Sequence, residues 1–444
     1  MKSSSASTGT SVWKSLDSVL RGERILAHNV VVGAGTMGAG ALGVAFQALV
    51  SHRLTPADYG GVFAVVTLIT LIGLPASAFT LLMARATSRD RATGQYAPSA
   101  ALLRGGNFSL MLGGLAIAGV LAILAPTLSA YLNVQSDLIL AGAAGIPFAL
   151  AFPLLLGDLQ GEQRFAYFSA LLVGQAGFKL IGALTLGVLL GPLGIVVGIS
   201  AGTALTYVVA MLILRQKLST KAALSWWGPA APYLAVVVPS TLALATLLSA
   251  DVLLVKHFFA TRQAGEYAAV AALGRAIFWG ATGVAGVLFP KMVFRESQRR
   301  SGASLVVVSL LLVVMGGVFG SVVLSLGSSA LLTAFAGPAY TEAARYLPWY
   351  AFGMTLLGGA AVLIATQQSR GDAGFLAVLV PLTVLEPVLL TAFHQSLMQA
   401  VQVVDISMAL VFGGLSAQFI VQKGASVVVD AASAPTELAG FPLS

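Results

Sequence analysis

The sequence has 444 residues, of which 57% are hydrophobic and only 9% are charged, and its mean hydropathy is +0.92. Soluble domains carry about 25% charged residues because their surface is in water, so this composition excludes a water-soluble enzyme and predicts a surface that faces lipid. The net charge of +8 does not indicate nucleic-acid binding, because the basic residues lie in short loops between apolar runs, where the membrane surface is the expected partner. The chain has no cysteine, which excludes disulfides and thiolate metal sites.

The chain begins with a polar segment, residues 1–28, that lacks the apolar core of a signal peptide. Within it Val12, Trp13, Leu16 and Leu20 recur at helical spacing, which predicts a short amphipathic helix on the membrane surface. A frayed tail is the alternative.

A transmembrane helix needs about twenty mostly apolar residues to cross the bilayer. Twelve stretches meet this requirement and predict an all-α membrane protein with about twelve transmembrane helices. In chain order they are residues 29–51, 60–84, 105–136, 138–157, 165–191, 192–214, 224–255, 267–290, 301–341, 346–369, 373–393 and 396–422. Only the Gly191-Pro192 break separates the fifth stretch from the sixth, so a single re-entrant pair is the alternative there.

The orientation follows from the basic residues. If the N-terminus is cytoplasmic, the cytoplasmic segments hold 18 of the 24 Lys and Arg residues and the outer loops hold four. Cytoplasmic loops of membrane proteins are enriched in Lys and Arg, so both termini are expected in the cytoplasm. The remaining two basic residues, Lys179 and Arg275, lie inside predicted spans.

A weak internal repeat has an offset of 205 residues. The matched pairs are His52 with His257, Gly60 with Gly265, Ala64 with Ala269, and Leu68 with Leu273. Each copy joins the first and second spans of a six-span half, so the two halves are expected to have the same orientation, as in transporters with a substrate site between two lobes.

The expected organisation therefore has five parts. They are a cytoplasmic amphipathic segment at 1–28, an N-terminal six-helix lobe at 29–214, a cytoplasmic linker at 215–223, a C-terminal six-helix lobe at 224–422 and a cytoplasmic tail at 423–444.

A glycine pattern at Gly33, Gly35 and Gly38 matches the dinucleotide-binding fingerprint. That motif requires a strand, a turn and a helix, whereas here the apolar run continues unbroken to Val50. Small residues at this spacing let transmembrane helices approach one another. We therefore expect no cofactor, and neither catalytic residues nor a metal site.

Five ionisable residues lie within predicted spans: Lys179, Asp251, Arg275, Glu386 and Asp405. An unpaired charge in lipid costs several kcal/mol, so each is a candidate functional residue. Lys179 and Arg275 lie near mid-span and could bind a pyrophosphate group from a hydrated cavity. Asp251, Glu386 and Asp405 are candidates for coupling or gating. The alternative for all five is structural pairing, for example of Arg275 with Asp251.

Three segments carry a resemblance to a known family. They are SHRLTPADYGGVFAV at 51–65, LQGEQRFAYFS at 159–169 and ADVLLVKHFFATRQAGEYAAVAALGRA at 250–276. With the span pattern, which covers about residues 25–421, the chain resembles the polysaccharide transporters of the multidrug/oligosaccharidyl-lipid/polysaccharide exporter superfamily, which are O-antigen and exopolysaccharide flippases. No single motif is diagnostic; the match rests on their order and placement.

The resemblance implies two six-helix lobes around a central cationic cavity in the cell inner membrane. The implied substrate is an undecaprenyl-diphosphate-linked oligosaccharide, moved from the cytoplasmic to the outer leaflet, and a polysaccharide polymerase is an implied partner beside the membrane lipids. Several relatives carry cavity cations in their spans, and Lys179 and Arg275 are the candidates for this role here. The lipid II flippase, a relative, has charged residues in its first span, whereas residues 29–51 have none in their core, which favours a saccharide repeat unit over lipid II.

Two other functions remain open. A cation-coupled multidrug exporter of the same superfamily would need acidic residues in its lobe to bind the cation, yet the first lobe has no carboxylate within a span. A membrane glycosyltransferase or polymerase would need a sizeable outer loop with catalytic groups, and the longest outer connection contains only Glu342 and Arg345 as charged residues.

Overall fold

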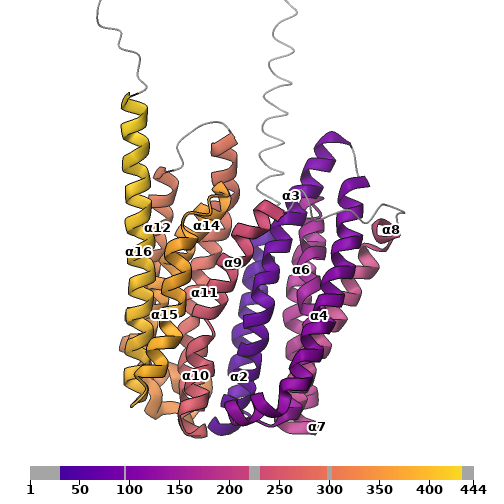
Figure 1. The fold of residues 1–444 in the computed structure, drawn as a ribbon. Coiled ribbons are helices and arrows are strands. Elements are labelled where there is room, and N and C mark those ends of the chain that lie inside the picture. Colours follow the sequence, from indigo (N-terminus) through magenta and orange to yellow (C-terminus); the bar gives the residue numbers. More distant parts are fainter. Residues whose placement is uncertain (1–30, 95–96, 220–230, 298–302, 433–444) are drawn as a thin grey trace, which may run out of the picture. The chain divides into compact units, whose positions relative to one another are not determined.

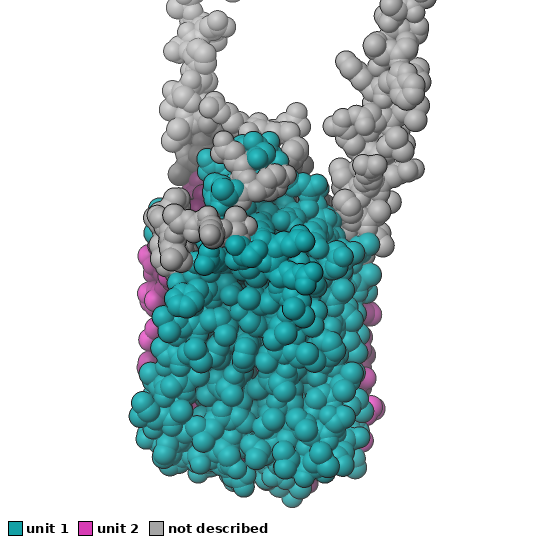
Figure 2. All heavy atoms as spheres, turned by 90° about the vertical axis from the view of Figure 1, so that its right-hand side faces the viewer, with its two compact units in different colours: residues 1–234, 259–268, 335–339 teal, residues 235–258, 269–334, 340–444 magenta. Residues whose placement is uncertain are grey.

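The computed structural model describes residues 31–94, 97–219, 231–297 and 303–432, and every regular element within them is helical (Figure 1). The predicted amphipathic segment at 1–28 lies outside these residues. The chain divides into two compact units, which Figure 2 draws in different colours. Unit 1 comprises residues 1–234, 259–268 and 335–339, and unit 2 comprises residues 235–258, 269–334 and 340–444.

The helices confirm the all-α membrane fold. Nine helices in the described part of the chain are long and apolar enough to cross a membrane. Lipid offers no partner for backbone N–H and C=O groups, so uninterrupted apolar stretches satisfy them within helices. One of the nine, Phe165–Ile213, contains a kink and covers two of the expected spans. A further apolar helix, Leu376–Ala392, has 17 residues.

Unit 1 contains most of the first half of the chain. After the helix Val31–Ser51 its elements are α2 (Pro56–Gly73), η1 (Leu74–Ala76), α3 (Ser77–Thr93), α4 (Ala97–Leu132), α5 (Ser136–Ala143), α6 (Ile146–Gly161), α7 (Phe165–Ile213) and α8 (Arg215–Leu218). The packed centre is α6, which lies against α3, α4 and α7. Its buried face includes Phe152 and Leu155, which pack with Met83 of α3, Leu103 of α4 and Tyr207 of α7.

The two halves of α7 form an antiparallel hairpin. Gly191 has φ 61° and ψ −138°, a conformation that glycine adopts without a Cβ clash, and Pro192 cannot continue the preceding helix. Beyond the turn, Gly198 packs on the backbone of Gly182, and Gly202 packs on the backbone of Lys179. Residues 165–191 and 192–213 are therefore two separate helices with a glycine-lined contact, and the Gly191-Pro192 break forms the turn between them.

The helices α2 and α11 (Thr261–Ser297) meet within unit 1 at the repeated glycines. The helix α2 begins at Pro56 and α11 begins at Thr261, so their starts are separated by the 205-residue offset of the repeat. Thr55 caps α2 through its hydroxyl, which accepts a hydrogen bond from the backbone N–H of Asp58 at 3.2 Å. An added Cβ at Gly60 would lie 2.9 Å from Gly265 Cα, so the backbones of α2 and α11 are in contact at these glycines.

Unit 2 contains most of the second half of the chain. Four of its elements also have residues in unit 1: α9 (Ala231–Leu247), α11 and η3 (Pro338–Tyr346) begin there, and α13 (Ser328–Ala336) ends there. The others are α10 (Ala250–Phe258), α12 (Ala303–Leu326), α14 (Leu347–Arg370), α15 (Leu376–Ala392) and α16 (Leu397–Ala432). The core helix is α14, which packs against α12 and α16 and buries most of its residues.

Several expected spans are interrupted. The apolar run at 301–341 is not one helix, because α12 ends at Leu326 and Gly337, with φ 102°, separates α13 from η3. The run at 60–84 breaks at η1, which contains Pro75. The helix α16 continues past residue 422 to Ala432, so the first part of the expected tail is helical.

Candidate functional site

Unit 2 holds a buried ion pair between Arg275 of α11 and Asp251 of α10. Arg275 Nη2 lies 2.9 Å from Asp251 Oδ1, and the two side chains are 9% and 1% exposed. The hydroxyl of Tyr350, on α14, accepts a hydrogen bond from Arg275 Nε at 3.0 Å and donates one to Asp251 Oδ2 at 2.8 Å. One guanidinium, one carboxylate and one phenol therefore join three helices.

Local sequence features bring these groups together. Asp251 lies in the first turn of α10, where the helix dipole favours a negative charge. Gly274 immediately precedes Arg275, and a Cβ at this position would lie 2.5 Å from the ring of Tyr350. The absence of a side chain at Gly274 thus allows the Tyr350 ring to pack directly on α11, with its hydroxyl at Arg275.

Two further carboxylates are buried in unit 2. Glu386 of α15 is fully buried and lies within electrostatic range of Asp251 and Arg275. Neither of its oxygens has a hydrogen-bond partner among the residues that the structure describes. Asp405 of α16 is 8% exposed, and its carboxylate packs on the backbone of Gly353 in α14. Burial of an ionised carboxylate without compensation is costly, so both positions favour a neutral group or a bound cation.

Lys179 belongs to unit 1, in the first half of α7. Its backbone is fixed by the close contact with Gly202, and its side chain is half-buried. Within the described part of the chain, the Lys179 ammonium makes no ion pair with a carboxylate. The carboxylates of unit 1, such as Asp58 and Asp158, lie near helix ends.

The five candidate residues fall into two groups. Asp251, Arg275 and Glu386 are brought together in unit 2, with Asp405 on a neighbouring helix of the same unit. Arg275 pairs with Asp251, as the structural-pairing alternative predicted. Lys179 lies in the other unit.

Sequence reasoning missed Tyr350, which contacts both members of the ion pair. The sequence argument selected ionisable residues within spans, so an uncharged tyrosine in an aromatic run gave no signal of its own. The useful signal is Gly274 beside a mid-span arginine, because a glycine next to a buried charge marks a place where another side chain approaches the helix backbone closely.

A second polar cluster, in unit 1, was also missed. Lys217 of α8 places its Nζ 2.5 Å from Asp158 Oδ1 and 3.1 Å from Glu162 Oε1. The hydroxyl of Thr87, on α3, donates a hydrogen bond of 2.7 Å to the same Asp158 oxygen. Asp158 and Glu162 follow the predicted span at 138–157, and no role was predicted for them. Their spacing of four residues puts both on one face of a helix, which is the signal for a shared partner.

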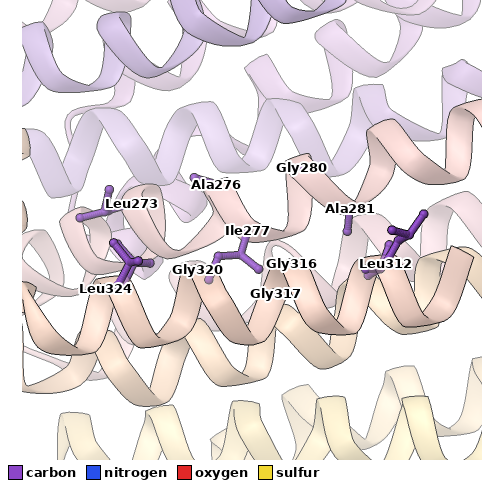
Figure 3. Close-up of a pocket in the computed structure, with 12 residues that line it drawn as sticks. Leu273, Ala276, Ile277, Gly280, Ala281, Leu312, Gly316, Gly317, Gly320 and Leu324 are labelled. Carbon is purple, nitrogen blue, oxygen red and sulfur yellow. The ribbon is translucent and has the colours of Figure 1, made fainter.

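An apolar groove lies between α11 and α12 of unit 2 (Figure 3), with a volume of about 490 Å³. Ile277 and Leu312 line it, and Gly280 and Gly316 leave it open, because an added Cβ at either glycine would have no heavy atom within 4 Å. The groove offers contact to hydrocarbon and no polar group that would orient a headgroup, so it is not part of the charged cluster.

The sequence matches no protein-family model and no curated protein. Solved structures, in contrast, match nearly the whole chain. An inward-facing multidrug-resistance transporter of the MATE family, in the MOP superfamily, is similar with a TM-score of 0.71 and 12% identity over 91% of this chain and 99% of that chain. The lipid II flippase MurJ, in an inward closed conformation, is similar with a TM-score of 0.64 and 13% identity over 88% and 87%. The chain has the fold of these transporters.

A third similar structure is the eukaryotic MATE transporter AtDTX14, with a TM-score of 0.64 and 12% identity over 87% of this chain and 94% of that chain. At this identity the likeness shows the fold alone. What the protein carries must therefore be argued from its own charged residues.

Proposed function

We propose that the protein is a flippase that moves a lipid-diphosphate-linked oligosaccharide from the cytoplasmic to the outer leaflet for polysaccharide biosynthesis. The observation that carries the proposal is a buried, mid-span Arg275 in a fold shared with a lipid II flippase. A guanidinium at this depth is costly unless it has a task or a partner, and its fork of donors matches phosphate oxygens.

Arg275 and Lys179 supply the positive charge for the diphosphate in this proposal. Arg275 would chelate two phosphate oxygens through its planar donors, whereas the ammonium of Lys179 would act as a point charge. Lys179 supports this role because no carboxylate in the described part of unit 1 forms an ion pair with it.

Coupling or gating is assigned to Asp251, Glu386 and Asp405. Glu386 and Asp405 are buried carboxylates that favour protonation or cation binding, so a change in their occupancy changes the net charge inside unit 2. Asp251 connects that charge to Arg275 through the ion pair.

A cation-coupled multidrug exporter is the second candidate, because MATE transporters share the fold and unit 2 holds three buried carboxylates. Two observations favour the flippase. The first unit has no described carboxylate near the middle of a span, and the mid-span cations would repel the cationic compounds that acidic sites attract.

The proposed setting is the cell inner membrane, with both termini in the cytoplasm, membrane lipids around the protein and a polysaccharide polymerase as a partner. The orientation is tested by alkaline phosphatase fused after Lys423. An inactive fusion is expected, and an active one contradicts the cytoplasmic C-terminus.

The substrate is tested in cells that depend on this protein for surface polysaccharide. Arg275→Lys should retain part of the export because the charge remains, whereas Arg275→Ala should abolish export. Membrane abundance is measured in the same cells, and export is expressed per molecule of protein. Normal export by Arg275→Ala at normal abundance would reject the role of Arg275 in transport. Accumulation of cationic dyes in cells that lack the protein, with normal polysaccharide, would favour the multidrug exporter.

A further inference from the structure

The ion pair of unit 2 uses the same edge of Arg275 that would bind a phosphate. Two oxygens face this edge: Asp251 Oδ1 lies 2.9 Å from Nη2, and the hydroxyl oxygen of Tyr350 lies 3.0 Å from Nε. Side-on bidentate binding of a phosphate would place two of its oxygens at these two nitrogens. The carboxylate and the phenol thus occupy the positions of two phosphate oxygens.

Tyr350 also holds Asp251 in this position, because its hydroxyl donates a hydrogen bond of 2.8 Å to Asp251 Oδ2. Asp251 therefore keeps the hydrogen bond from Tyr350 when Arg275 turns away, but it loses this ion pair in a site where its side chain is only 1% exposed. Breaking a buried ion pair is unfavourable. Any ligand of Arg275 must overcome this penalty, so the ion pair opposes phosphate binding.

We propose that Asp251 is an internal competitor for Arg275: it occupies the guanidinium when no substrate is bound, yields to the diphosphate of the substrate and recaptures Arg275 as the substrate leaves. This inference rests on the proposed function. It gives Asp251 a role in substrate release, because a transporter whose arginine has no competitor holds the diphosphate too tightly to release it quickly. Tyr350 is a positioning residue that keeps Asp251 aligned with Arg275.

The test is binding of geranylgeranyl diphosphate to the full-length protein in lipid nanodiscs, measured by titration calorimetry. Asp251→Asn removes the competing charge and should tighten binding roughly tenfold or more, since the binding-competent fraction of Arg275 rises. Tyr350→Phe leaves the ion pair in place but removes both hydrogen bonds and should tighten binding less. Arg275→Gln should abolish binding.

The matched control is Glu266→Gln, which breaks the pair with Arg262 on the same helix and should leave the affinity unchanged.

Transport is the second readout. In proteoliposomes Asp251→Asn should translocate the same lipid more slowly than the wild type despite its tighter binding, because release becomes limiting.

The outcomes separate this inference from the proposed function. Arg275→Gln with wild-type affinity refutes the substrate role of Arg275, and with it the competitor. Loss of binding in Arg275→Gln, together with unchanged or weaker binding in Asp251→Asn, refutes the competitor alone. An equal gain in Glu266→Gln also refutes it, because the effect would then be a general one of negative charge. If Asp251→Asn does not fold, Tyr350→Phe decides: unchanged affinity in that variant counts against the inference. Failure of both wild type and Asp251→Asn to bind the lipid rejects the diphosphate substrate.

Discussion

The substitution Lys217→Met tests the polar cluster of unit 1. Lys217 is the only cation within ion-pairing distance of Asp158 among the described residues, and the Asp158 side chain is fully buried. Removing one partner of a buried ion pair costs about 3–5 kcal/mol, because it leaves the other charge uncompensated. Here the hydrogen bond from Thr87 remains and Lys217 is 14% exposed, so we expect the lower end, about 3 kcal/mol.

The loss should be visible as thermal instability of the purified full-length protein in detergent. At about 2–4 °C per kcal/mol for a domain of the size of unit 1, the melting temperature should fall by roughly 6–12 °C. The double variant Lys217→Met with Asp158→Asn should recover most of this loss, because asparagine is neutral and still accepts the hydrogen bond from Thr87.

Arg215→Met is the matched control. Arg215 lies two residues before Lys217 on the same short helix and is exposed, so its loss should change stability by less than about 0.5 kcal/mol. If Lys217→Met melts at the temperature of Arg215→Met, the Asp158 carboxylate does not depend on its cation, and the reasoning is wrong.

Two more predictions concern unit 2 and the mid-span cations. Gly274→Ala should destabilise the protein by about 1–3 kcal/mol because its Cβ would meet the Tyr350 ring. Gly280→Ala, on the same helix but facing open space, should be neutral or stabilising by at most about 1 kcal/mol. Equal melting temperatures of the two variants would contradict the close packing of the ring. Arg275→Ala should lower membrane abundance because it removes the ion-pair partner of the buried Asp251 carboxylate, whereas Lys179→Ala should not. Quantitative immunoblots of membranes compare the two variants. Normal abundance of Arg275→Ala would mean that the ion pair does not stabilise the fold.

The helical membrane fold was predictable because its signals are additive over long stretches. Any twenty apolar residues give nearly the same expectation in lipid, and the Gly191-Pro192 pair correctly marked a turn between two helices. The interruptions were harder to predict. The run at 301–341 has no charge at the places where α12 and α13 end, so composition does not locate them. Breaks of this kind depend on backbone conformation at single glycines such as Gly337.

The candidate site was predictable as a set of residues but not as an arrangement. The cost of burying charge in lipid selects Arg275, Asp251 and Glu386 from sequence alone. It does not decide which groups pair, because pairing depends on helix rotation and on which side chains reach across. Tyr350 shows this limit: it carries no charge, and only the packing of α14 on α11 makes it part of the site.

The two mid-span cations, Arg275 and Lys179, differ in whether they form an ion pair, and this difference bears on the proposed transport. A cation inside a membrane protein persists if it is paired or hydrated. Arg275 is paired with Asp251, which Tyr350 holds in place, so a ligand that binds the Nε and Nη2 edge must displace Asp251. Lys179 forms no ion pair within the described part of unit 1, so its charge is not held by a competing carboxylate. Under the proposed function, a diphosphate at Lys179 would therefore gain attraction without breaking an ion pair, whereas a diphosphate at Arg275 would bind by exchange with Asp251. In the proposed flippase, this exchange would speed the dissociation of the diphosphate from Arg275 and so favour its release to the second leaflet.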